Sequence, residues 1–298
     1  MVQRPRAGTS AAQPRRQGRE AVRWHLHRGV CVRFCAFALL ALTWLLVGAA
    51  PAWSLLLTPE AALKHAEQSI THPEGVVWTL DVEVDEGDRI SRRTLLLTAK
   101  GFNVLAEVLR PREMQGQLLL RSKAELWAIN PGESLPAPLR PNDRYLGPVS
   151  YDNLMPTDYL DNYHIEAVAE DTAFGEACLL FTLRGNEELG EYDMVRLWVS
   201  KERLVAVKAN FYGPTGRFLT SAHIKYEHDA LIDGEIRPFI SEMIIRSGLF
   251  SDASARLEWS PPQILNIPSD TFELRALLGP EAYAELLIQQ ERERQREE

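Results

Sequence analysis

The sequence predicts a mainly β protein of the α+β class, and three features of the chain lead to this prediction. Apolar and polar residues alternate over many short runs, which is typical of antiparallel strands with one buried face. One long proline-rich segment interrupts these runs. Patterns typical of helices stand mainly at the two ends of the body, at residues 58–72 and 274–298.

The first 54 residues form a separate leader. Residues 1–33 hold eight Arg and one acid, Glu20, and an uncharged apolar stretch follows from Phe34 to Ala50. Ala52 and Ser54 supply the small residues that signal peptidase cleavage after Ser54 requires. We therefore expect a secretory signal peptide, with the mature chain beginning near Leu55.

Other interpretations of the leader stay open. The uncharged run extends to Pro59, and a span of about 20 apolar residues is enough for an uncleaved membrane anchor. The leader is also long, so the start codon could lie near Val30 instead of Met1. A lipoprotein signal is excluded, because Cys31 and Cys35 stand at the start of the apolar core and not after it.

The body after the leader is acidic. The whole chain carries a net charge of −8, and the leader contributes +7, so residues 55–298 carry about −15. A surface of this sign argues against nucleic acid and against an anionic membrane face, but not against lipid held inside the protein. Cys178 is the one cysteine left in the body, so no intrachain disulfide can form there.

A helix and a series of strands are expected along the body. Thr58 is a favoured N-cap and Pro59 suits the first helical position, so a helix should begin there and end before Pro73. The expected strands are Val76–Asp85, Ile90–Ala99, Phe102–Leu109, Gln117–Arg121, Ala124–Ile129, Ala177–Leu183, Tyr192–Val199, Leu204–Phe211, Phe218–Tyr226, Ile236–Ile245 and Ala255–Trp259.

The segment from Asn130 to Asp161 has a different character. It contains six prolines, a density that should exclude ladder strands. Its piece Val149–Met155 is apolar enough to dock on the body, so we expect a short helix there and a movable cover with Tyr151, Leu154 and Met155 as docking side chains. The charged tail Pro280–Glu298 should be a solvated helix or disordered, which leaves residues 55–279 as the folded domain.

The search for catalytic or metal-binding motifs finds none. The sequence has no G-x-S-x-G, H-E-x-x-H, C-x-x-C, P-loop or dinucleotide fingerprint, so no enzymatic activity and no cofactor or metal is expected. His223 and His228 lie five residues apart on one expected strand and point to opposite faces. Aromatic residues are numerous on the strands. Core packing is the simpler explanation, and an apolar cavity that accepts an acyl chain is the alternative. The candidate cavity residues are Trp78, Leu80, Trp127, Trp198, Phe211 and Met243.

Several stretches together give the chain a family resemblance. They are Glu125–Pro131, Gly147–Leu154, Tyr192–Val199, Lys208–Tyr212 and the pairs Arg237-Pro238 and Glu242-Met243. In order and spacing they resemble the LolA-like outer membrane lipoprotein-sorting proteins, and in particular the long branch found beside lipid exporters of the resistance-nodulation type. Pro148 and Asn153 depart from the family pattern, in which a Ser and an acid are usual.

The resemblance implies an open antiparallel half-barrel sheet whose concave face is covered by helices. It also implies a periplasmic carrier for lipid or for the acyl chains of lipoproteins, with an inner-membrane transporter as a candidate partner. The competing interpretation is a periplasmic sensor or scaffold of the RseB type that binds a protein partner. A hydrolase is a third class, which the absence of a nucleophile–base set disfavours.

Overall fold

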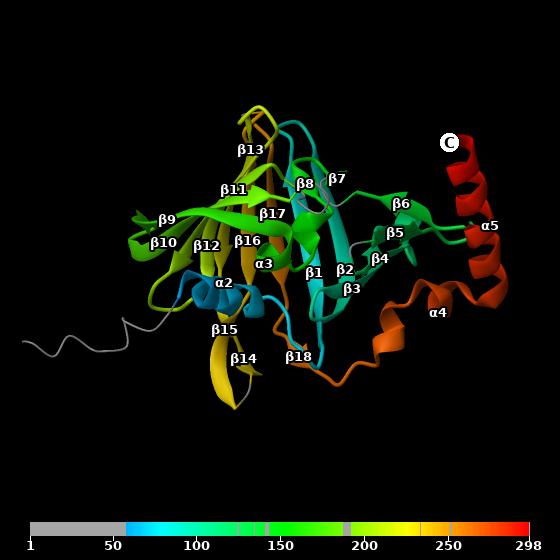
Figure 1. The fold of residues 1–298 in the computed structure, drawn as a ribbon, viewed down its shortest axis with the longest axis horizontal. Coiled ribbons are helices and arrows are strands. Elements are labelled where there is room, and N and C mark those ends of the chain that lie inside the picture. Colours follow the sequence, from blue (N-terminus) through cyan, green and yellow to red (C-terminus); the bar gives the residue numbers. More distant parts are fainter. Residues whose placement is uncertain are drawn as a thin grey trace, which may run out of the picture. The chain divides into compact units, whose positions relative to one another are not determined.

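The computed structural model describes residues 58–297, apart from residues 124, 134, 141–142, 187–191, 233 and 251. The predicted leader and its cleavage site after Ser54 lie outside the described residues. The described part is built around one large open antiparallel sheet with few helices (Figure 1). This architecture confirms the predicted mainly β class and the open half-barrel.

The sheet joins two meanders through a pair of strands from the C-terminal part of the chain. Its order is β6-β5-β4-β3-β2-β1-β17-β16-β13-β12-β11-β10-β9, and β18 adds to the end of β1. Leu80 of β1 lies opposite Trp259 of β17, so this pairing closes the ladder between the two meanders. The strands of the sheet are β1 (Val76–Asp85), β2 (Ile90–Lys100), β3 (Asn103–Arg110), β4 (Leu118–Ser122), β5 (Glu125–Ile129), β6 (Ala137–Leu139), β9 (Tyr163–Ala173), β10 (Glu176–Gly185), β11 (Met194–Ser200), β12 (Ala206–Tyr212), β13 (Phe218–Lys225), β16 (Glu242–Ser247), β17 (Ser254–Trp259) and β18 (Gln263–Ile264).

Two hairpins stand outside this sheet, β7 (Arg144–Leu146) with β8 (Val149–Ser150), and β14 (His228–Ile232) with β15 (Glu235–Phe239). The predicted continuous strand Ile236–Ile245 is therefore wrong. Phe239 and Ile240 are both buried, which breaks the alternation, and the chain turns there from β15 into β16. His223 and His228, which we expected on one strand, lie on different strands, β13 and β14, because the chain leaves the large sheet after Lys225.

The proline-rich segment contains three short strands, β6, β7 and β8, and β6 joins the large sheet. In β6, Pro138 lies opposite Trp127 of β5, although we expected prolines to exclude strands here. The reason is that β6 stands at the edge of the sheet, where a residue without an N–H group is tolerated.

The helices begin where local chemistry favours them. The Ala61 N–H donates to the Thr58 hydroxyl at 3.2 Å, which confirms the expected cap of α2 (Pro59–Gln68). The Asp161 N–H donates to the Asp158 carboxylate at 3.1 Å and caps the single turn α3 (Tyr159–Asn162). The other helical elements are α4 (Leu274–Leu278), α5 (Pro280–Glu297) and the 3₁₀ turns η2 (Arg112–Met114), η3 (Asp152–Leu154) and η4 (Ser269–Phe272).

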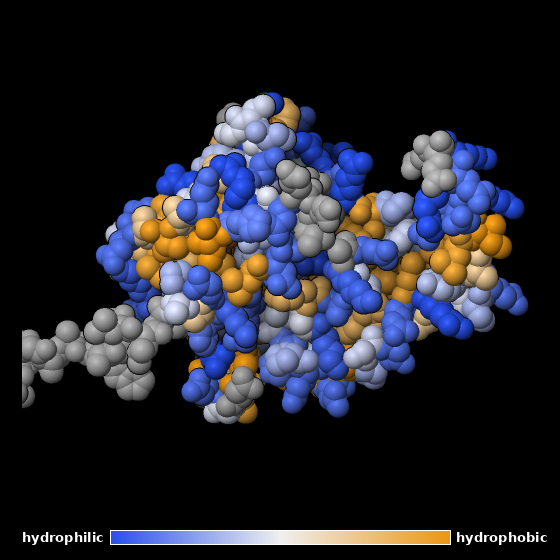
Figure 2. Space-filling model, in the orientation of Figure 1, coloured by the Kyte–Doolittle hydropathy of each residue, from blue (hydrophilic) through white to orange (hydrophobic). Residues whose placement is uncertain are grey.

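The main core lies on the concave face of the sheet, which we call the inner face. Ala62, Leu63 and Ala66 of α2 pack there against the strands. On the opposite, outer face α4 and α5 cover β3–β5, and Leu286 of α5 is buried beside Trp127. Part of the tail that we expected to be solvated is therefore docked. Figure 2 shows apolar surface on α5 and on the β14–β15 hairpin, where Leu231 and Ile236 are 62% and 76% exposed.

Candidate functional site

The candidate site is the apolar region between the inner face, α2 and residues 143–162, which we call the cover. Most of the sequence-predicted site residues belong to the single apolar cluster that fills this region. They are Trp78 and Leu80 of β1, Phe211 of β12, Met243 of β16, and Tyr151, Leu154 and Met155 of the cover. The sheet and the cover thus meet through the side chains that the sequence singled out for each of them.

Trp127 and Trp198 do not join this group. Trp127 packs in a separate cluster with Leu120, Phe272 and Leu286 on the outer face. Trp198 packs with Cys178 and other buried residues in a third cluster, and its indole N–H donates to the Asp171 carboxylate at 2.8 Å. Side chains alternate along a strand, so neighbouring Val199 faces inward while Trp198 faces outward.

Two tyrosines in contact, and an arginine of the sheet, hold one end of the cover to the sheet. The ring centroids of Tyr145 and Tyr151 lie 5.3 Å apart, and the Arg93 guanidinium of β2 lies 5.0 Å from the centre of the Tyr145 ring. Burial raises the pKa of Tyr145 to about 12, against the opposing effect of Arg93. A cation over an aromatic face is attracted by the ring, so Arg93 anchors this end of the cover.

A buried ion pair joins the middle of the cover to the sheet. Nη1 of Arg121 on β4 lies 3.7 Å from Oδ1 of Asp152 on η3, and the two side chains are 6% and 3% exposed. The Thr157 hydroxyl also donates to Asp152, at 3.2 Å. One charge of this pair belongs to the sheet and the other to the cover, so the pair forms only when the cover is closed. Taking two charges out of water is costly unless they remain paired.

A network of hydrogen bonds between neutral groups lies next to this ion pair. The Ser150 N–H donates to the Asn153 side-chain oxygen at 3.0 Å, and the Ser150 hydroxyl lies 3.0 Å from the same oxygen and 3.0 Å from the Tyr192 hydroxyl. All three residues are buried. Asn153 therefore holds the turn of the cover, a role that an acid in the family pattern could not fill without burying another charge.

Glu67 links α2 to the far end of the cover. Its carboxylate is buried and accepts a hydrogen bond from the Leu160 N–H of α3 at 2.9 Å. Burial raises the pKa of Glu67 to about 7, and the negative charge of Asp158 adds to the effect while the hydrogen bonds from the backbone oppose it. The Glu67 carboxyl group, which joins α2 to the cover, therefore changes its charge near neutral pH.

The space left under the cover is small in this conformation. A cavity of about 40 Å³ lies between α2, the cover and strands β12, β13 and β16, and a second of about 20 Å³ adjoins it beside Trp78. Ile70, Met155, Ile240 and Met243 line both cavities. One water molecule needs about 10–15 Å³ on this measure, so an acyl chain cannot enter unless the cover moves.

The described residues offer little other chemistry. They contain no group of three or more His, Cys, Asp or Glu side chains that could hold a metal ion. Within the same residues, no helix has the length and apolar character that a membrane crossing needs.

Sequence reasoning missed the charged residues of the site, namely Glu67, Arg121 and Asp152. One signal was present, because Arg121 follows three leucines in a strand and alternation places it on the same side as Leu119. A charge at an inward position calls for a buried partner. Which partner this is depends on how the cover folds back, and the local sequence does not contain that information.

Comparison with known proteins supports the fold. A LolA superfamily protein from Nitrosomonas europaea matches with a TM-score of 0.64 and 24% identity, over 72% of this chain and 97% of that chain. A putative outer membrane lipoprotein-sorting protein domain from Vibrio parahaemolyticus matches with a TM-score of 0.63 and 14% identity, over 74% and 100%. A DUF1329 family protein from Desulfovibrio piger matches with a TM-score of 0.59 and 17% identity, over 73% and 98%.

The sequence comparisons identify one family. No curated protein matches the chain. A family model described as "-like: Uncharacterized protein" matches residues 102–278, which is more than half of the chain. The chain therefore belongs to this family of uncharacterized proteins, and its fold is LolA-like.

Proposed function

We propose that the protein is a periplasmic carrier that holds the acyl chains of a lipid or of a lipid-modified protein between the inner face and the cover. The observation that carries this proposal is the way in which the cover is attached. Its apolar side chains pack on the inner face, yet β7 and β8 pair only with each other and not with the large sheet. Such a segment can leave the sheet without breaking the ladder of hydrogen bonds.

The energetics of cargo binding fit this arrangement. Each methylene group of an acyl chain gains about 0.8 kcal/mol when it leaves water. Leu154 and Met155 occupy the inner face when the cover is closed. An acyl chain that displaces them replaces one set of apolar contacts with another, so the open, loaded state and the closed, empty state can lie close in free energy. A carrier needs this balance in order to release its cargo.

The test is ligand binding by purified protein that has been stripped of lipid. We expect saturable binding of a fluorescent fatty acid, displaced by a lipopeptide, and co-purified lipid in native mass spectrometry. Exchanging Tyr151 and Leu154 for alanine should change this affinity, because both side chains dock the cover. Leu120→Ala is the matched control, since Leu120 is equally buried but packs on the outer face. Well-folded protein that binds no apolar probe would contradict the carrier function.

A further inference from the structure

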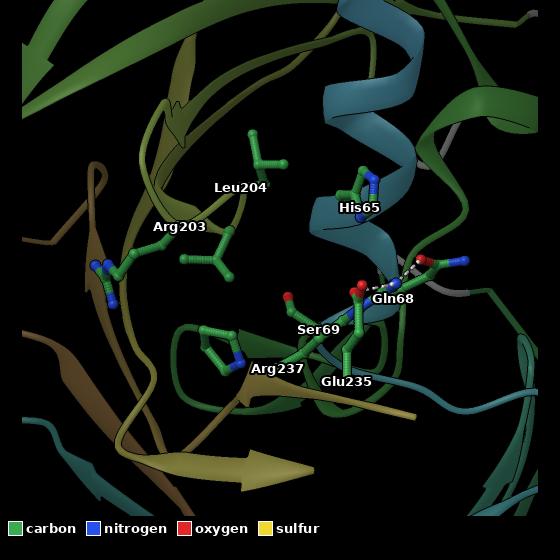
Figure 3. A pocket seen from close by; sticks show the side chains of 9 residues that line it. His65, Gln68, Ser69, Arg203, Leu204, Glu235 and Arg237 are labelled. Atoms are coloured by element: carbon green, nitrogen blue, oxygen red, sulfur yellow. Dashed lines mark hydrogen bonds and ion pairs between the residues drawn. The ribbon is translucent and has the colours of Figure 1, made fainter. Parts of the chain in front are cut away.

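A second pocket lies outside the cover, between the end of α2, the turn from β11 to β12, and β15 (Figure 3). Its volume is about 170 Å³. Pockets for drug-sized ligands are larger, about 300–1,000 Å³, so this one has room for a small polar group and not for a whole lipid. Nothing in the carrier function described above uses this pocket.

Arg237 is one of the charged residues that line this pocket. Its Nη1 donates to the Gln68 side-chain oxygen at 3.1 Å, and its Nη2 lies 3.2 Å from the Glu235 carboxylate (Figure 3). The Arg237 side chain is 23% exposed, whereas that of Glu235 is 72% exposed. An ion pair with so exposed a carboxylate is worth little, about 0–1 kcal/mol, so another anion can take its place.

The rest of the pocket suits an anion with an apolar extension. His65 lies on α2 beside Arg237, and burial, followed by the charge of Arg237, lowers its pKa. Leu204 forms part of the wall and has a φ of 53°, in the left-handed region that a leucine rarely adopts. Arg203 does not compete for the ligand, because it is paired with Glu176 at 2.5 Å.

The pocket is next to the cavity under the cover. Ser69 lines the pocket and the next residue, Ile70, lines the cavity. Likewise Val205 lines the pocket and Ala206 lines the cavity. The Tyr226 side chain, whose hydroxyl donates to the Ala206 carbonyl oxygen at 3.0 Å, also lines the cavity at this wall. One layer of residues thus separates this surface pocket, which the charged side chain of Arg237 lines, from an apolar space inside.

We propose that this pocket receives the phosphate group of an anionic lipid whose acyl chains lie under the cover. The assignment rests on the proposed carrier function and narrows its cargo to a phospholipid. Arg237 forms the bidentate contact that a guanidinium makes with phosphate, Gln68 fixes its orientation, and Glu235 swings away into solvent. The acylated end of a lipoprotein has no phosphate and would leave Arg237 paired with Glu235.

The experiment compares two lipids that differ only in their headgroup. Delipidated protein is titrated with phosphatidylglycerol and with a diacylglycerol of the same acyl chains, by displacement of a fluorescent fatty acid. We expect phosphatidylglycerol to bind about tenfold more tightly or better, the effect of one charge-assisted contact. Arg237→Gln should remove this preference and leave diacylglycerol binding unchanged. Glu235→Gln should increase the preference for phosphatidylglycerol, a gain that a folding defect cannot produce.

Arg217→Gln is the matched control, because it removes the same charge from an exposed position in the β12–β13 turn. Equal affinity for the two lipids in the unaltered protein, or an equal loss in the Arg217 and Arg237 variants, would overturn the proposal. Glycerol 3-phosphate that competes as well as phosphatidylglycerol would show a soluble phosphate ester to be the ligand, and would also overturn it. Binding of neither lipid and of no fatty acid would instead refute the carrier function itself.

Discussion

Replacing Asp152 with alanine is expected to release the cover from the sheet. The substitution removes the carboxylate that lies 3.7 Å from the Arg121 guanidinium, while the Arg121 side chain is only 6% exposed. Water cannot solvate this charge while the cover is closed. The free energy of the closed state should therefore rise, whereas the open state, in which Arg121 reaches solvent, is unaffected.

The magnitude follows from the geometry. Two unit charges 3.7 Å apart attract each other by about 4.5 kcal/mol at an effective dielectric constant of about 20. Mutations that remove one member of a buried pair cost about 3–5 kcal/mol, which is the same range. Opening of the cover should become at least about a hundredfold more favourable.

Hydrogen exchange measures this opening directly. Cover amides should exchange at least about a hundredfold faster in Asp152→Ala, while amides of β10–β13 remain more protected than those of the cover. Glu166→Ala is the control, because the pair of Glu166 with Arg184 is about half exposed and should cost no more than about 1 kcal/mol. Exchanging Arg121 for Met and Asp152 for Asn together should restore much of the protection, since both buried charges of this ion pair are then removed.

Two results would refute this reasoning. The first is a cover whose exchange is unchanged in Asp152→Ala, which would mean that the buried pair does not hold it closed. The second is hydrogen exchange in which the amides of the cover and of the sheet have the same free energy of opening, both in the unaltered protein and in Asp152→Ala. The cover would then be part of the core and not a movable element.

Three further predictions concern other parts of the chain. Burial raises the pKa of Glu67 from 4.5 in the unfolded chain to about 7, so the contribution of Glu67 to stability is full below pH 4.5 and is lost as the pH rises to about 7. Glu67→Gln should therefore have the same unfolding free energy as the unaltered protein at pH 4 and a value about 3 kcal/mol higher at pH 8. A difference in unfolding free energy that is the same at both pH values would contradict this. Trp127→Ala should cost about 3–5 kcal/mol and loosen α5, with fatty-acid affinity unchanged; a loss of affinity would tie the outer cluster to the site. N-terminal sequencing of exported protein should begin near Leu55, and a membrane-bound product that retains Phe34–Ala50 would favour an uncleaved anchor.

The sequence by itself determined the elements whose signal is local. Alternation is read from one strand at a time, and it placed β1 correctly at Val76–Asp85. The cap at Thr58 depends on contacts three residues away and was equally readable. Apolar residues in a proline-rich segment likewise indicated that the cover docks on the body, as Leu154 does.

The tertiary structure alone decided which apolar face belongs to which layer. Trp78 and Trp127 both stand on apolar strands, yet the first faces the cover and the second faces α5, because this sheet is packed on both sides. Its two faces cannot be told apart when each is apolar. The contact of Arg121 with Asp152, and the pocket of Arg237, join segments far apart in the chain, and only the fold brings such residues together.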